Sequence, residues 1–243
     1  MKPFLLLGVR PEPVAADDEY AAFARFTGLG TDLQRHAVDR EPFTGDPRDY
    51  AGIIIGGSPF NVTDTAKSSQ QQRAEEDLNR VVDVALAERI PLLGACYGLG
   101  LIARHKGGIV DHEYGEQIAA VPVTLTAAGR TDPVFGGLPQ VFSAIVGHKE
   151  AVSTPPADAV VLATSPGAPV QALRIGPAAY ATQFHPELDA DGLLIRMTTY
   201  RDAGYFDPQE ADAIMALARA TDVTHPPESL RAFVAFAEGF NPA

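Results

Sequence analysis

The sequence has little of what several classes of protein require. It contains one cysteine and no tryptophan, and a single cysteine excludes a disulfide within the chain. Basic residues are scarce, with 19 Lys and Arg against 31 Asp and Glu, so most of the surface would repel nucleic acid and anionic lipid. No apolar run approaches the roughly 18 residues that cross a bilayer, and the apolar start at residues 4–9 is too short for a signal sequence. We therefore expect a cytoplasmic protein that binds neither nucleic acid nor membranes.

What is present indicates an α/β fold. With 243 residues, 46% of them apolar, the chain is long enough to bury a core without disulfide or metal support. In the first half, apolar runs alternate with helical patterns, an order typical of a mostly parallel central sheet flanked by helices. The expected strands are 4–9, 50–55 and 90–93, and the expected helices are 19–26 and 70–89.

The second half is richer in short strands. Candidates are 119–126, 141–146, 160–163, 170–175 and 178–184, separated by glycine and proline without helical spacing. Helices return after Asp191, because Asp207-Pro208 is typical of a helix start and Pro226-Pro227 precedes a last apolar stripe. We expect a main domain over residues 1–203, which would carry any active site, and a C-terminal helical extension, 204–243, packed on the same domain.

Residues 91–103 combine a strand end, a tight turn and a helix start around the lone cysteine. The turn reads Gly94-Ala95-Cys96-Tyr97-Gly98, a nucleophile elbow in which side chains at 94 or 98 would collide across the bend. Cys96 would point outward at a helix N-terminus, where the helix dipole favours the thiolate. The N–H of Tyr97 could receive an oxyanion, so its side chain would be free to vary. A lone cysteine is otherwise a small buried residue, but the spaced glycines favour a nucleophile.

A base for that nucleophile lies far along the chain. The segment Phe184-His185-Pro186-Glu187 ends an expected strand, and the proline favours an extended backbone at His185. Residues two apart in an extended chain project to one side, so Glu187 can orient the His185 ring and stabilise its charged form. Cys96, His185 and Glu187 are therefore candidates for nucleophile, base and orienting acid.

These motifs resemble those of the class I glutamine amidotransferases, the Cys-His-Glu family to which the glutaminase domain of GMP synthase belongs. The resemblance covers roughly residues 4–200 and implies a flavodoxin-like fold. It also implies an oxyanion hole formed by the N–H groups of Tyr97 and of Gly57, which lies in the turn Gly56-Gly57-Ser58-Pro59. The implied reaction is hydrolysis of the glutamine side-chain amide through a γ-glutamyl thioester, without a cofactor. Ammonia from such enzymes normally passes to a synthase, so a synthase subunit is a possible partner.

Two departures from the family pattern concern the substrate pocket. Many members carry glutamine four residues after the cysteine, where this chain has Gly100. Gly147-His148-Lys149-Glu150 stands where members similar to GMP synthase have a Ser-His-Gly-Asp-like segment. The resemblance implies a substrate pocket formed by Gly98, Gly100, Gly147 and His148, although His148 is equally compatible with an exposed loop. Whether glutamine itself fits this pocket stays open.

Three functions are compatible with the sequence. The first is a stand-alone amidotransferase that releases ammonia for an unidentified acceptor, because the chain has no P-loop or ATP-pyrophosphatase motif of a complete GMP synthase. The second is a γ-glutamyl hydrolase or peptidase-like enzyme on a modified glutamine, which Gly100 would tolerate. The third is a weakly active regulatory or binding subunit of a synthase. A homo-oligomer is possible in each case. His105, His112 and Glu113 lack metal-site spacing, so no metal is expected.

Overall fold

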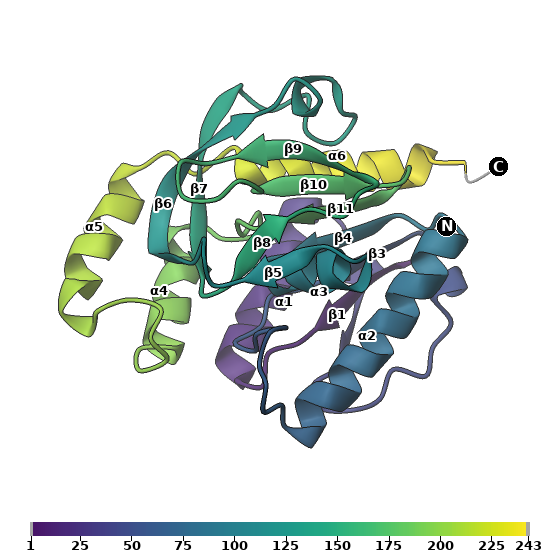
Figure 1. Cartoon of the computed structure of the whole chain (residues 1–243), viewed down its shortest axis with the longest axis horizontal. Coiled ribbons are helices and arrows are strands. Elements are labelled where there is room, and N and C mark those ends of the chain that lie inside the picture. The colour runs from purple at the N-terminus through teal and green to yellow at the C-terminus, as the bar shows by residue number, and fades with distance from the viewer. Residues whose placement is uncertain (1, 242–243) are drawn as a thin grey trace.

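The computed structural model describes residues 2–241, in which a nine-stranded sheet has helices on both faces (Figure 1). The strand order is β2-β1-β3-β4-β11-β10-β9-β6-β7. The first five strands in this order are parallel: β2 (Leu33–Ala37), β1 (Phe4–Gly8), β3 (Gly52–Ile55), β4 (Leu92–Ala95) and β11 (Ala179–Thr182). The others add antiparallel: β10 (Ala172–Ile175), β9 (Ala159–Thr164), β6 (Glu116–Leu125) and β7 (Val141–His148). The predicted α/β class is confirmed, and the short strands of the second half extend the same sheet.

Three groups of helices cover the sheet. α2 (Ser69–Ala87) and α3 (Tyr97–His105) bury their apolar sides against one face, together with Ile53 and Ile55. α1 (Pro13–Thr27) and α6 (Pro226–Gly239) cover the other face, where Phe23 and Phe233 pack with Phe4. α4 (Ala190–Thr199) and α5 (Ala211–Ala220) share a third cluster with residues of β6 and β7. The C-terminal helices are therefore part of the cores that hold the sheet.

Several elements differ from the sequence-based expectation at their ends. α1 begins at Pro13 rather than residue 19, because proline is well accommodated in the first turn of a helix. β2 was not expected, since it is an edge strand in which only Leu33 is buried and no apolar alternation appears. A short antiparallel pair, β5 (Ile109–Asp111) with β8 (Ala151–Thr154), is likewise too short to show a pattern. Asp207 caps a 3₁₀ turn at 208–210, and α5 starts only after it.

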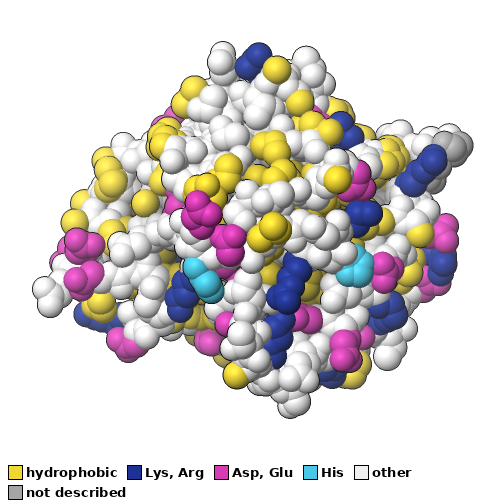
Figure 2. Space-filling model, viewed as in Figure 1, with side chains coloured by type: hydrophobic (Ala, Val, Ile, Leu, Met, Phe, Trp, Pro, Cys, Tyr) yellow, Lys and Arg dark blue, Asp and Glu magenta, His cyan; other side chains and the backbone are white. Residues whose placement is uncertain are grey.

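Charged side chains are spread over the surface in view. Figure 2 shows acidic and basic groups interspersed on this face, so the net charge of −12 does not gather there into a field of one sign. Within residues 2–241, no helix combines the length and the apolar composition that a membrane span would need. The surface in Figure 2 therefore points to no single charged partner.

Candidate active site

Cys96 occupies the turn between β4 and α3. Its backbone has φ 51° and ψ −96°, and within residues 2–241 only one other non-glycine residue, Arg89, has a positive φ. The flanking glycines make the turn possible. A Cβ on Gly94 would lie 2.7 Å from the carbonyl carbon of Gly98, and a Cβ on Gly98 would lie 2.8 Å from the Ile55 carbonyl oxygen. The predicted order of strand, tight turn and helix start is confirmed. The expected collision across the bend is confirmed for Gly94, whereas a side chain at 98 would collide with Ile55 of the neighbouring strand.

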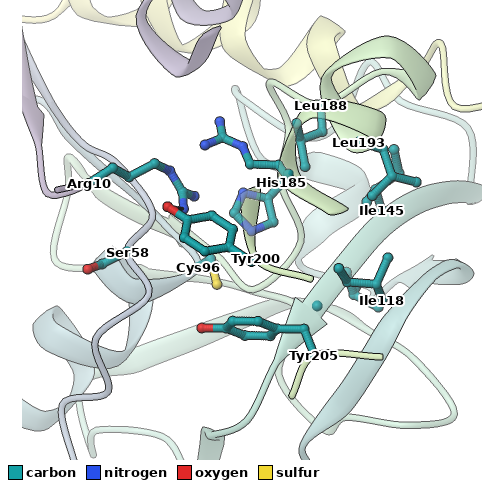
Figure 3. A pocket seen from close by; sticks show the side chains of 13 residues that line it. Arg10, Ser58, Cys96, Ile118, Ile145, His185, Leu188, Leu193, Tyr200 and Tyr205 are labelled. Atoms are coloured by element: carbon teal, nitrogen blue, oxygen red, sulfur yellow. Dashed lines mark hydrogen bonds between the residues drawn. The ribbon is translucent and has the colours of Figure 1, made fainter. Parts of the chain in front are cut away.

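Cys96 and His185 meet because β4 and β11 are parallel neighbours. Ala95 pairs with Thr182, and the Cys96 N–H donates to the Thr182 carbonyl at 2.7 Å. Parallel strands end at the same edge of a sheet, so the chain leaving β11 passes beside the elbow. The His185 N–H donates to the carbonyl of Ile145 on β7 at 2.9 Å, which anchors this segment. The structure brings Cys96 and His185 to the same pocket, which both border in Figure 3.

Glu187 lies behind His185. Its Oε1 is 2.8 Å from Nδ1 of His185, and its side chain is fully buried. Burial opposes the charged imidazole, but the Glu187 carboxylate and Cys96 outweigh this effect and raise the pKa of His185 to about 9. Burial also opposes the charge of Glu187, yet the adjacent His185 holds the pKa of Glu187 below its usual value. The ring can therefore carry a proton at neutral pH beside an ionised carboxylate.

The two expected oxyanion donors are in different situations. Tyr97 is the first residue of α3. Its N–H is therefore one of the donors at the helix start that have no carbonyl acceptor within the helix. The N–H of Gly57 instead donates to Oε1 of Glu19 at 3.1 Å. Gly57 is therefore not an open oxyanion donor in this structure, contrary to expectation, because a buried carboxylate already accepts its hydrogen. It does border the site, since a Cβ there would lie 2.9 Å from Cε1 of His185.

The ion pair that holds Gly57 was not expected from the sequence. Arg10 follows β1, and its Nε donates to Oε1 of Glu19 at 2.8 Å, with both side chains buried. Nη1 of Arg10 also donates to the Tyr200 hydroxyl at 3.3 Å. Burial opposes the charge of Arg10, but Glu19 and Tyr200 outweigh it and raise the pKa of Arg10. A signal was present, because Glu19 falls on the buried stripe of α1 between Ala15 and Ala22.

Cys96 lies between two pockets that share Ser58, Cys96, Gly147 and Tyr205. The first we name the histidine pocket; its other residues are Arg10, Ile118, Ile145, Val146, His185, Leu188, Leu193, Arg196 and Tyr200. The second we name the elbow pocket; its other residues are Phe60, Asn61, Tyr97, Gly100, His148, Lys149, Glu150 and Gln183. Figure 3 shows the Cys96 thiol between His185 and Tyr205, with the aliphatic side chains away from Arg10.

Three of the four expected substrate-pocket residues line the elbow pocket: Gly100, Gly147 and His148. His148 is buried rather than exposed on a loop. Its Nδ1 lies 3.0 Å from the Glu150 carbonyl oxygen, and its Nε2 lies 3.0 Å from the Glu116 carboxylate. Gly98 borders neither pocket and faces Ile55 of β3. The expectation that Gly98 contacts substrate is therefore replaced by a packing role.

Two residues of α3 behave differently from their expected roles. The Tyr97 ring is buried and its hydroxyl donates to Oε1 of Glu75 at 3.3 Å, so the expectation that this side chain is free to vary is wrong. At position 100, by contrast, a Cβ would lie 3.4 Å from Val62 Cγ2 and 3.6 Å from Glu150 Oε1, which are near-ordinary contacts. Space therefore does not require a glycine at 100, as it does at Gly98.

The chain beyond α4 also reaches the site. Tyr205 borders both pockets, and its carbonyl accepts the Ile118 N–H at 3.1 Å. Its hydroxyl donates to the Pro59 carbonyl at 3.4 Å, and Nζ of Lys149 lies 4.8 Å from the centre of its ring. No local motif marks this residue, which the sequence alone places in the C-terminal extension without a role.

The histidines that were considered for metal binding are engaged elsewhere. Nε2 of His105 lies 2.7 Å from an Asp83 carboxylate oxygen, and Nδ1 of His112 lies 2.9 Å from the Lys149 carbonyl oxygen. In the part of the chain that the structure describes, no group of three or more potential ligand side chains could hold a metal ion.

The chain is similar to known proteins along most of its length. The family model "Glutamine amidotransferase class-I" matches residues 20–192. A glutamine-hydrolysing GMP synthase of Thermosipho africanus is 33% identical over 143 residues, which are 57% of this chain and 24% of that protein. The corresponding protein of Geobacillus kaustophilus is 31% identical over 167 residues, which are 66% of this chain and 29% of that protein. The chain therefore spans about a quarter of the length of these relatives.

Solved structures show the same fold. A glutamine amidotransferase from Thermotoga maritima superimposes with a TM-score of 0.79 at 16% identity, covering 99% of this chain and 100% of that one. Another, from Methylobacillus flagellatus, gives 0.77 at 20% identity and covers 99% and 96%. The family match covers well over half of the chain, and the fold agrees with it. The chain belongs to the class I glutamine amidotransferase family.

Proposed function

We propose that this protein hydrolyses γ-glutamyl amides with Cys96 as nucleophile, and that glutamine is the first substrate to test. The observation that carries the proposal is that Cys96 and His185 border one pocket and that the His185 ring lies 2.8 Å from Glu187. These are the three parts that covalent amide hydrolysis requires: a nucleophile, a base beside it and a group that orients the base. Membership of the family supports the same chemistry.

The proposed reaction has two stages. The Cys96 thiolate attacks the amide carbonyl carbon while His185 holds the proton, and the Tyr97 N–H donates to the oxygen that becomes negative. The C–N bond then breaks, and the His185 proton moves to the departing nitrogen, which leaves a γ-glutamyl thioester. Water attacks this thioester after giving a proton to His185, and the C–S bond breaks to release glutamate and the Cys96 sulfur.

Gly57 can supply a second oxyanion donor only if its N–H leaves Glu19. A rotation of the peptide between Gly56 and Gly57 would achieve this while Arg10 continues to neutralise the carboxylate at 2.8 Å. A single oxyanion donor is worth about 10²- to 10³-fold in kcat, which is enough to compensate for one lost hydrogen bond. We propose that substrate binding accompanies this rearrangement.

The acceptor of the released nitrogen is a separate question. The glutamine-hydrolysing GMP synthases that match this chain are about four times longer than the matching part. We propose that a synthase subunit receives the ammonia. A second candidate is hydrolysis of a modified glutamine by the chain alone. The presence of Gly100 in the elbow pocket favours this candidate.

The test is to incubate the purified protein with glutamine and with a diazoketone analogue of glutamine. We expect release of glutamate and ammonia, and an increase in intact mass on Cys96 with the analogue. The Cys96→Ala variant should show neither, with an unchanged circular dichroism spectrum, because the fold does not require the sulfur. Glutamate release by Cys96→Ala would contradict the mechanism. A wild-type protein that forms no adduct would instead support a regulatory subunit.

A further inference from the structure

The elbow pocket borders the nucleophile but not the base. His185 lines the histidine pocket and does not line the elbow pocket. In the proposed reaction the departing nitrogen takes its proton from His185, so this nitrogen faces the imidazole. The γ-glutamyl group stays on the sulfur and extends away from His185. Figure 3 shows Tyr205, a residue of the elbow pocket, on the other side of the Cys96 thiol. The elbow pocket is therefore the one in which the γ-glutamyl group is expected.

A γ-glutamyl group brings a negative charge into this pocket. Its α-carboxylate lies two methylene groups beyond the reacting carbonyl carbon. A carboxylate that leaves water needs a cation or several hydrogen-bond donors. The elbow pocket already contains the Glu150 carboxylate, and a second like charge is unfavourable there unless a cation compensates it. Binding of the substrate therefore depends on which group of the pocket receives its α-carboxylate.

Most polar side chains of the elbow pocket already have partners. Four of them donate to other groups of the chain: the hydroxyls of Ser58, Tyr97 and Tyr205 and the amide of Asn61. Both ring nitrogens of His148 lie 3.0 Å from an acceptor oxygen. Gly100 and Gly147 have no side chain. Nε2 of Gln183 lies 3.9 Å from Sγ of Cys96, so this amide is at the reacting end of the substrate. None of these side chains is a free donor at the α-carboxylate end.

Lys149 is the donor that remains. Among the described residues 2–241, it is the only Lys or Arg that borders the elbow pocket, and no carboxylate forms an ion pair with its ammonium. Its neighbour Glu150 accepts instead from the N–H groups of Val62 and Thr63, at 2.6 and 3.0 Å. An exposed lysine beside a pocket is often only solvated, but this one is the single cation on a wall that must receive an anion.

The Lys149 side chain is positioned at both of its ends. Its Nζ lies 4.8 Å from the centre of the Tyr205 ring, a distance at which an ammonium is attracted to the ring face. A Cβ on Gly204 would lie 3.8 Å from the same Nζ. At the backbone, the Lys149 carbonyl oxygen lies 2.9 Å from Nδ1 of His112. Binding an anion therefore costs less side-chain entropy than it would for a freely moving lysine.

We propose that Lys149 is a specificity-determining residue that binds the α-carboxylate of the γ-glutamyl substrate. This inference rests on the proposed function of Cys96 and adds how the substrate of that reaction is recognised. The ammonium donates a charge-assisted hydrogen bond to the carboxylate, and the Tyr205 ring keeps the ammonium beside the pocket. Lys149 therefore selects γ-glutamyl compounds with a free α-carboxylate.

The experiment compares glutamine with glutamine α-amide, in which a neutral carboxamide of the same shape replaces the α-carboxylate. Chromatography distinguishes the products, which are glutamate and isoglutamine. Lys149→Met should lower kcat/KM for glutamine about ten-fold, mainly through KM, because a hydrogen bond between charged groups is lost. The same variant should change kcat/KM for the α-amide less than about two-fold, since the methionine stem still covers the Tyr205 ring. Lys149→Arg should keep at least about a third of the wild-type value for glutamine, because the cation remains.

Lys106→Met is the matched control, because Lys106 pairs with Asp158 at 3.4 Å and borders neither pocket. It should leave both substrates unaffected, and thermal unfolding should show that all three variants fold. An unchanged value for glutamine in Lys149→Met, an equal loss for both substrates, or an equal loss in Lys149→Arg would overturn the inference. If the wild-type protein hydrolyses neither compound and its Cys96 forms no adduct with the diazoketone analogue, the proposed function itself fails, and this inference fails with it.

Discussion

The parallel and antiparallel ends of the sheet supply different parts of the site. The groups of the proposed mechanism lie just beyond parallel strands: Cys96 after β4 and His185 after β11, with Gly57 after β3. The antiparallel strands β6 and β7 supply walls such as Ile118 and Ile145. The groups of the proposed mechanism are thus placed by short motifs at strand ends, whereas the pockets beside them are formed by packing between segments distant in sequence. Changes at the two ends should therefore affect different kinetic quantities.

The largest effect is expected where the parallel strands meet. His185→Ala should lower kcat at least about 10⁴-fold, because it removes the proton acceptor and donor of both stages. The loss in kcat for Glu187→Gln should be about 10²-fold smaller than for His185→Ala, since Glu187 is expected to orient the ring and stabilise its charge without touching substrate. Steady-state rates of glutamate release measure both. Equal losses in the two variants would mean that the carboxylate does more than orient the imidazole.

The next prediction compares activity and stability after substitution of two glycines in the same helix. Gly98→Ala should lower kcat about 10²-fold and stability by about 1–3 kcal/mol, because its Cβ would press on the Ile55 carbonyl 2.8 Å away and displace the Tyr97 N–H. Gly100→Ala should stabilise the fold by up to about 1 kcal/mol, since alanine favours helix and has room there. Urea unfolding with activity assays measures both. A tolerated Gly98→Ala would show that the elbow is not sterically constrained.

The same contrast explains what the sequence could predict. The Gly94–Gly98 elbow and the His185-Pro186-Glu187 segment are local patterns, and their meeting follows from the rule that neighbouring parallel strands end at one edge. The engagement of the Gly57 N–H could not be predicted, because it depends on how deeply α1 places Glu19. Tyr205 was equally hidden, since its position depends on how the chain returns after α4. The helical spacing of Ala15, Glu19 and Ala22 marks Glu19 as buried, but no pattern in the sequence identifies the group that such a buried side chain contacts.

A third prediction concerns stability at the parallel end. His185 has a pKa of about 9 in the folded chain and about 6.5 when unfolded, so folding favours its protonated form. This stabilisation is fully present below pH 6.5 and is lost as the pH rises through about 9. The shift corresponds to roughly 3 kcal/mol in the free energy of unfolding. Urea titrations between pH 6 and 10 measure it.

The control for this titration lies outside the site. In Glu187→Gln, the free energy of unfolding should decrease less above pH 6.5 than in the wild type, because the carboxylate that favours the imidazolium is gone. His105→Asn changes a histidine that is paired with Asp83 on the surface of α2 and α3. In this variant, the free energy of unfolding should decrease with pH as in the wild type. A Glu187→Gln variant with the wild-type pH dependence would show that another group sets the charge of His185.

The smallest effect is expected at the antiparallel end, where Tyr205 borders both pockets. Tyr205→Ala should raise KM about ten-fold and change kcat by less than about three-fold, because a wall contributes equally to binding substrate and transition state. Tyr205→Phe should be almost neutral, since the hydroxyl contact with Pro59 is 3.4 Å long while the ring stays in place. Leu217→Ala, on the exposed side of α5, should change neither quantity. A loss in kcat at unchanged KM would mean that this segment acts on the reacting groups, and the division between the two ends of the sheet would then be wrong.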